Sequence, residues 1–257
     1  GPLLAWKRGD ALGAAQRLWA AAALALGLGL AAYAAFEPRK AFAAGGVAVG
    51  AWLLLGALAE LAERGRLGRA PAAETFRRWR GLPLGAWGMT LAHAGLGIFV
   101  LGAVVETAWK VETAAVLSPG QSLAVGAYEL RLETVEAIEG PNFVAERARM
   151  SARRADRLVC RPTPERRLYP AGGQTTSEVA LCLRGLDDLY IVLGEQRPGP
   201  DGRAAWLVRG YFNPWARLIF LGPAIMALGG LLSLADRRLR LAAPARRPSR
   251  NALAIPQ

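Results

Sequence analysis

Histidine is almost absent from this chain, since His93 is the only one among 257 residues. Cysteine occurs twice, at Cys160 and Cys182, with a spacing that matches no redox or zinc motif. A glycine-rich phosphate loop and a cluster with metal-ligand spacing are also missing from the sequence. These absences exclude most common catalytic and metal sites, and they leave few residues with distinctive chemistry.

Hydrophobic residues, in contrast, make up 53% of the chain. They concentrate in four stretches that can each cross a bilayer as a helix, which takes about 20 residues. The stretches are residues 18–36, 41–62, 84–108 and 215–235. The first is neither terminal nor followed by a separate mature domain, so it is not a signal peptide. Four spans exclude a purely soluble or nucleic-acid-binding protein, and we expect an α-helical membrane protein with about four transmembrane helices.

Basic residues gather at alternate ends of these spans. They are Lys7, Arg8, Arg17, Arg64, Arg66, Arg69, Arg77, Arg78, Arg80, Arg237, Arg238, Arg240, Arg246, Arg247 and Arg250. Basic segments stay on the cytoplasmic side of a membrane, so we place the N-terminal segment 1–17, the linker 63–83 and the tail 236–257 there. Residues 109–214, whose acidic and basic residues nearly balance, then lie on the other side.

The connections between the spans differ in character. Glu37, Pro38, Arg39 and Lys40 form a tight turn, so residues 18–62 are expected to be a helical hairpin. The linker 63–83 is either a short basic helix lying on the membrane or a plain solvated connector.

The outer segment 109–214 has the alternating pattern of half-buried strands. Tyr128–Glu133 alternates apolar and charged residues, and the same period of two appears in two later stretches. These are Val179, Leu181 and Leu183, then Leu189, Ile191 and Leu193. Six to eight short strands predict a small all-β domain, either an antiparallel sandwich or a barrel, inserted between the last two spans. Its two cysteines form either a disulfide or two buried thiols.

Chemistry in this outer domain is limited, because a domain without histidine has no Ser-His-Asp or Cys-His relay. Asp187 and Asp188 are adjacent, and on a strand they face opposite ways, so they do not form a catalytic pair. By elimination, the one group with distinctive chemistry is His93, inside the span 84–108.

An ionisable side chain within a membrane span generally faces a partner, a cavity or a cofactor. For His93, the residues leave open a ligand role and a hydrogen bond to a neighbouring helix. Small or short side chains surround it on the helix, namely Gly88, Thr90, Ala92, Gly95 and Gly97. They allow a bulky neighbour to come close, which suits both a flat macrocycle and ordinary helix packing.

Several stretches resemble those of a known family, and they occur in the same order along the chain. They are GPLLAWKRGD, WGMTLAHAGL, LSPGQSLAVGAYELRLETVEAIEGPNF, TPERRLYPAGGQTTSEVAL, DDLYIVLGE and WLVRGYFNPWARLIFLGPAIMALGGLLSLADRR. Together they are similar to the C-terminal part of CcmF, the large membrane subunit of the bacterial cytochrome c maturation machinery. That family attaches haem to apocytochrome c.

The resemblance implies more than the residues show. The histidine of the family's Leu-Ala-His-Ala-Gly motif, which matches His93, is an axial iron ligand of an intramembrane b-type haem. The second axial ligand and the tryptophan-rich segment that holds incoming haem belong to the family's N-terminal half, and they are missing from this sequence. The chain therefore resembles a fragment, a split subunit or a truncated product that is not active alone.

The resemblance also implies a location and partners. We expect a multi-pass protein of the bacterial inner membrane, with residues 109–214 in the periplasm. The expected partners are the N-terminal half or a separate subunit carrying the tryptophan-rich segment, the haem chaperone, the apocytochrome-handling subunits and apocytochrome c. We expect no nucleic-acid partner.

Two functions remain at this point. One is the C-terminal part of a haem lyase, a holocytochrome c synthase complex, with His93 as one haem ligand and no catalytic side chain of its own. The other is a non-catalytic membrane scaffold, whose periplasmic β domain docks assembly partners or apocytochrome.

Overall fold

The computed structural model describes residues 11–35, 41–199 and 202–236. The expected turn at residues 37–40 and most of the basic tail lie outside these residues. The described residues fall into two compact units. One holds the described residues within 25–51 and 98–221, and the other holds the described residues within 1–24, 52–97 and 222–257.

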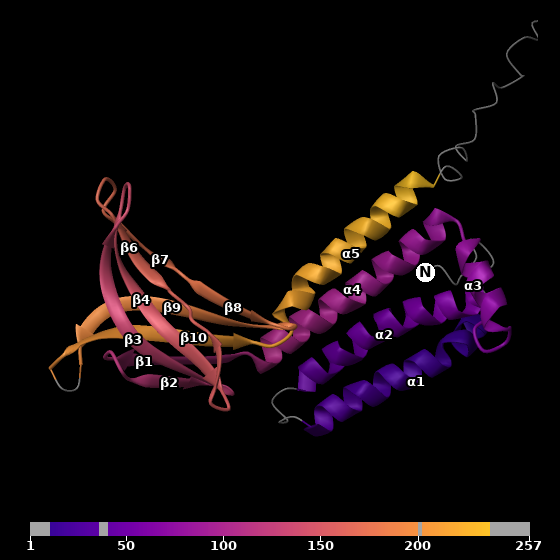
Figure 1. The fold of residues 1–257 in the computed structure, drawn as a ribbon. Helices are drawn as coiled ribbons and strands as arrows, with labels where there is room; N and C mark the ends of the chain where they lie inside the picture. The colour runs from indigo at the N-terminus through magenta and orange to yellow at the C-terminus, as the bar shows by residue number, and fades with distance from the viewer. Residues whose placement is uncertain (1–10, 36–40, 200–201, 237–257) are drawn as a thin grey trace, which may run out of the picture. The chain divides into compact units, whose positions relative to one another are not determined.

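Four long helices and one short helix account for the apolar stretches and the linker (Figure 1). They are α1 (Ala11–Ala35), α2 (Ala41–Gly65), α3 (Ala72–Arg80), α4 (Leu84–Trp109) and α5 (Ala216–Ala235). Within the described residues, α2, α4 and α5 are long and apolar enough to cross a membrane, and α1 contributes the shorter apolar stretch Trp19–Ala34. The expected helical membrane protein is confirmed.

The linker contains a helix, α3, rather than a plain connector. Its Trp79 is tied to the preceding helix, because the indole Nε1 donates a hydrogen bond of 2.9 Å to the carbonyl oxygen of Leu61. The backbone carbonyl of Trp79 in turn accepts a hydrogen bond of 3.2 Å from Trp87 Nε1, at the start of α4. These bonds join the ends of α2 and α4 through α3.

Between α4 and α5, the described residues form ten strands in two antiparallel sheets. The first sheet has the order β1-β10-β9-β8, with β1 (Val111–Leu117), β10 (Ala204–Asn213), β9 (Asp187–Pro198) and β8 (Ala180–Arg184). The second has the order β2-β3-β4-β6-β7, with β2 (Ser122–Val125), β3 (Tyr128–Glu139), β4 (Val144–Arg154), β6 (Glu165–Tyr169) and β7 (Gln174–Glu178). A short strand, β5 (Arg157–Cys160), pairs with β4.

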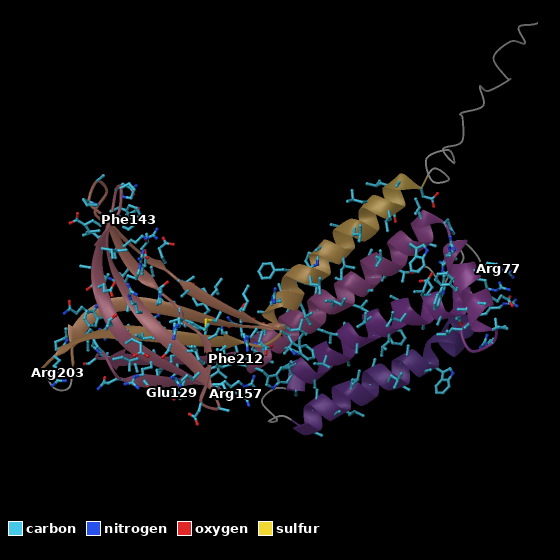
Figure 2. All side chains as sticks on the ribbon, in the orientation of Figure 1. Arg77, Glu129, Phe143, Arg157, Arg203 and Phe212 are labelled. Carbon is cyan, nitrogen blue, oxygen red and sulfur yellow. A yellow bond between two sulfur atoms is a disulfide. The ribbon has the colours of Figure 1, made fainter. Side chains whose placement is uncertain are left out.

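The inward-facing residues of the two sheets share one apolar core. Leu130 and Leu132 of β3 are fully buried, as are Ile191 and Leu193 of β9, while the residues between them on β3 point outward. Phe212 of β10 packs against the same core and is labelled in Figure 2. The predicted alternation in these two strands, and the inserted all-β domain, are therefore confirmed.

In β8 the apolar residues of the predicted alternation, Leu181 and Leu183, face outward instead of into the core. Leu181 and Leu183 are 55% and 54% exposed, whereas Cys182 between them is 5% exposed and packs in the core. Val179 lies between β7 and β8, outside both strands. The period of two was correct, but the opposite set of side chains points inward.

Cys160 and Cys182 form a disulfide, which decides between the two alternatives left by the sequence. Cys160 ends β5, which pairs with the second sheet, and Cys182 lies on β8 of the first sheet. The bond therefore crosses the core and connects the two sheets.

Candidate functional site

His93 lies in α4 and is half-buried. Its ring atom Nδ1 is 2.9 Å from the carbonyl oxygen of Met89, one turn earlier in the same helix. A carbonyl oxygen only accepts hydrogen bonds, so Nδ1 must carry the proton that is donated. In a neutral ring, this leaves the lone pair on Nε2.

That tautomer is the one that metal-binding histidines usually adopt. A histidine that binds a metal through one nitrogen generally donates its other N–H to a carbonyl or carboxylate, which fixes the ring. No described residue forms a hydrogen bond with Nε2 of His93. The side chain therefore has the donor set of an axial haem ligand, and it fits that role.

The alternative left by the sequence was a hydrogen bond to a neighbouring helix. Among residues 11–35, 41–199 and 202–236, the only hydrogen bond of His93 is the one to its own helix. The nearby polar residue Thr90 behaves in the same way, because its hydroxyl donates to the carbonyl of Ala86 at 3.1 Å.

The small residues near His93 pack against α5. A Cβ atom built on Gly95 would lie 2.7 Å from the carbonyl oxygen of Gly222, and one built on Gly229 would lie 2.6 Å from the carbonyl oxygen of Gly88. With about 100° of rotation per residue, His93 lies roughly 150° around α4 from the line through Gly88 and Gly95. This glycine strip is thus used for helix packing, on a different side of α4 from the imidazole.

Asp187 and Asp188 of the β domain have structural partners. Asp188 accepts a hydrogen bond from the Asn213 side chain at 2.7 Å, and Asp187 accepts one from the backbone N–H of Trp215 at 2.9 Å. Within the described part of the chain, no group of three or more His, Cys, Asp or Glu side chains could hold a metal ion. The first candidate for cofactor chemistry therefore remains His93.

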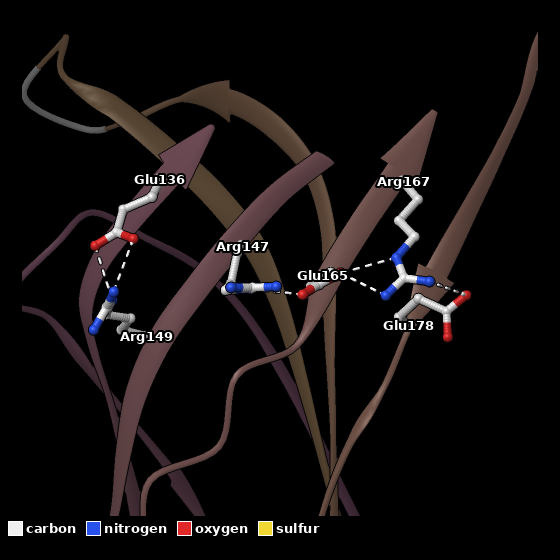
Figure 3. A network of polar contacts seen from close by, with 6 residues as sticks. All are labelled: Glu136, Arg147, Arg149, Glu165, Arg167 and Glu178. Carbon is white, nitrogen blue, oxygen red and sulfur yellow. Dashed lines mark hydrogen bonds and ion pairs between the residues drawn. The ribbon is translucent and has the colours of Figure 1, made fainter. Parts of the chain in front are cut away.

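A network of arginine and glutamate side chains crosses the second sheet (Figure 3). Glu165 is at its centre, with Arg147 Nε at 2.6 Å from one carboxylate oxygen and Arg167 at 2.8 Å from the other. Burial acts to raise the pKa of Glu165, but the two guanidinium hydrogen bonds outweigh it and hold that pKa below its ordinary value. The network stabilises strand pairing. Apart from Glu165 and Arg167, which share β6, its pairs join different strands, and the register that brings them together is not visible in the sequence.

Known proteins share both the sequence and the fold of this chain. Residues 108–214 match the family described as "CcmF C-terminal beta-sandwich". The chain is 40% identical over 244 residues to the cytochrome c-type biogenesis protein CycK of Bradyrhizobium diazoefficiens, and 42% identical over 255 residues to CycK of Rhizobium meliloti. These alignments cover 95% and 99% of this chain.

A solved structure named "Cytochrome c Heme Lyase CcmF" has a similar fold. The TM-score is 0.65 at 20% sequence identity, and the match covers 92% of this chain and 37% of that one. The present chain spans little more than a third of its curated relatives, namely 36% of the Bradyrhizobium protein and 37% of the Rhizobium protein.

Proposed function

Because the chain belongs to the CcmF family of cytochrome c-type biogenesis proteins and corresponds to its C-terminal part, we propose that it takes part in attaching haem covalently to apocytochrome c. The solved relative is named a haem lyase, which supports this reaction. The chain would act as one part of a larger assembly, since it spans about a third of its relatives.

We propose that His93 is one axial ligand of an intramembrane b-type haem. The main support for this proposal is the hydrogen bond from Nδ1 to the Met89 carbonyl, which leaves Nε2 as the metal-binding nitrogen. The haem would supply electron transfer to the reaction, and the protein would tune it through ligand identity and burial. The role of this chain is to hold the imidazole in one tautomer and orientation.

We place residues 109–214 in the periplasm and the helices in the inner membrane. The arginine-rich linker and tail favour the cytoplasmic side of the membrane. Residues 109–214 join the other ends of the last two spans, so they lie on the periplasmic side. A disulfide between Cys160 and Cys182 supports the same placement, because disulfides persist in oxidising compartments such as the periplasm.

The second haem ligand and the segment that holds incoming haem would come from the N-terminal half or a separate subunit. The other proposed partners are the haem chaperone, the apocytochrome-handling subunits and apocytochrome c. His93 is the only histidine of the chain, so a second imidazole must come from outside these 257 residues.

Covalent haem attachment in cells tests this function. The chain, expressed with the part of the family that it does not include, should restore c-type cytochromes in a host that lacks its own family member. The variant His93→Ala should lose most haem-stained cytochrome c, whereas Met89→Leu should retain it, because the backbone carbonyl that accepts from Nδ1 is unchanged.

Equal cytochrome c levels in His93→Ala and the unaltered chain would contradict the proposed role of the imidazole. Membrane levels of each variant, measured by immunoblot, separate lost function from lost protein.

A further inference from the structure

The outer face of the first sheet, made of β1, β10, β9 and β8, is unusually apolar. One row of paired residues runs from Leu181 to Tyr190 to Tyr211 and ends at Glu112 on β1. The two tyrosine rings pack edge to face, with centroids 5.5 Å apart. Leu183 and Leu207 lie on the same face, and Leu183 is more than half exposed.

The outer face of the second sheet has the opposite character. Glu129 lies opposite Arg153, and Arg131 lies opposite Ser151. Further along the same face is the arginine and glutamate network of Figure 3. Outer faces of sandwiches are normally polar in this way, because they meet water. The first sheet departs from the rule within the same domain, so solvent alone does not account for its surface.

A groove of about 380 Å³ lies beside the apolar side chains of this face. It is lined by Arg197 of β9, by Arg209, Leu207 and Tyr211 of β10, and by Arg166, which comes from β6 of the second sheet. The groove also contains a carboxylate, Glu195, which already accepts a hydrogen bond from Arg197. This bond lowers the pKa of Glu195.

Arg209 lies near the middle of the face, opposite Val192 of β9. No ion pair to Arg209 is formed by any described residue, and Arg166 has only a long contact of 3.8 Å to Glu146. The groove therefore carries an excess of positive charge beside the half-buried side chains of Leu207 and Tyr211.

Tyrosine and arginine surrounded by apolar side chains are typical of the central residues of protein interfaces. The positive charge selects a partner with the opposite sign at the matching point. We propose that the outer face of the first sheet docks a polypeptide segment of a partner protein, in which apolar side chains flank a carboxylate that pairs with Arg209. This inference uses neither His93 nor haem, so it stands or falls separately from the proposed function.

Site-specific photocrosslinking in native membranes tests the proposal. The full chain, with its complement, carries p-benzoylphenylalanine in place of Tyr190, or in place of Glu129 on the second sheet as a matched control. Position 190 should give a discrete product whose crosslinked peptide, identified by mass spectrometry, belongs to another protein and contains Asp or Glu among apolar residues. Position 129 should give none.

Charge reversal then tests the pairing. Arg209→Glu should lower the yield of the product about tenfold or more, and replacing the partner carboxylate with lysine should restore it. An intact Cys160–Cys182 disulfide and an unchanged melting temperature show that each variant is folded. The proposal is overturned by an absent product, by equal products at positions 190 and 129, by insensitivity to Arg209→Glu, or by adducts with phospholipid or a second copy of the chain.

Discussion

At the residue scale, Glu165 shows how a largely buried charge is tolerated in the β domain. Its carboxylate is 8% exposed and is shared by two guanidinium groups from adjacent strands. Charge-assisted hydrogen bonds of this kind are stronger than neutral ones, and removing one partner leaves buried polar atoms unpaired. Glu165 therefore connects β4 and β6, and Arg167 extends the network to Glu178 of β7.

The substitution Glu165→Gln should lower the free energy of unfolding of the β domain by about 1–2 kcal/mol at neutral pH. The exposed pair between Glu136 and Arg149 provides the control, because surface ion pairs contribute only about 0–1 kcal/mol. Thermal unfolding of the purified protein in detergent measures both variants. Equal stability losses in Glu165→Gln and Glu136→Gln would contradict the central place given to Glu165.

The same carboxylate predicts a pH dependence. The folded-state pKa of Glu165 is lower than its unfolded value, so its stabilisation is fully present above the unfolded pKa of about 4.3 and is lost as pH falls through the folded pKa. The melting temperature of the unaltered chain should fall more steeply below about pH 4.5 than that of Glu165→Gln. Parallel curves for the two proteins would show that Glu165 does not titrate as described.

At the element scale, the contact between α4 and α5 depends on glycines. Gly229 meets the backbone of α4, while no atom lies within 4 Å of a Cβ built on Gly230. The adjacent residues are therefore a matched pair with opposite surroundings on one helix.

Gly229→Ala should destabilise the protein by about 1–3 kcal/mol, because the added methyl group forces the helices apart. Gly230→Ala should be neutral or stabilising by up to about 1 kcal/mol, since alanine favours helix. Melting of the detergent-solubilised protein distinguishes the two. Equal effects at the two positions would mean that the helices do not pack in this register.

The disulfide connects elements of two sheets and should matter for stability. Cross-linking residues 22 apart is expected to contribute about 3 kcal/mol in the chain-entropy description. Cys160→Ala combined with Cys182→Ala should lower the melting temperature by several degrees, and reductant should lower that of the unaltered chain similarly. Free thiols in the protein purified without reductant would show that the bond does not form.

At the scale of the whole molecule, composition and periodicity predict most of the fold. The length of the apolar stretches predicts α2, α4 and α5. His93 stands out in the sequence because it is an ionisable side chain inside one of these stretches. The facing of β8 was not predictable, because both Leu181 with Leu183 and the alternative, Cys182, satisfy a period of two. The leucines face outward, where the apolar surface of the first sheet lies.

The polar network around Glu165 also escapes sequence reasoning. Arg147, Glu165 and Glu178 are opposite one another only through the register of β4, β6 and β7. The hydrogen bond of His93 differs from this network because it is local. Its acceptor, the Met89 carbonyl, lies four residues earlier in the same helix, so it depends on no contact between distant segments.

We propose that Nε2 of His93 binds haem iron within the membrane. The most direct measurement is the reduced-minus-oxidised absorption spectrum of the purified assembly that contains this chain, with His93→Gly compared with Met89→Leu. We predict that His93→Gly loses or shifts the haem bands, that added imidazole restores them, and that Met89→Leu matches the unaltered protein. An unchanged spectrum in His93→Gly without imidazole would show that His93 does not bind the haem iron.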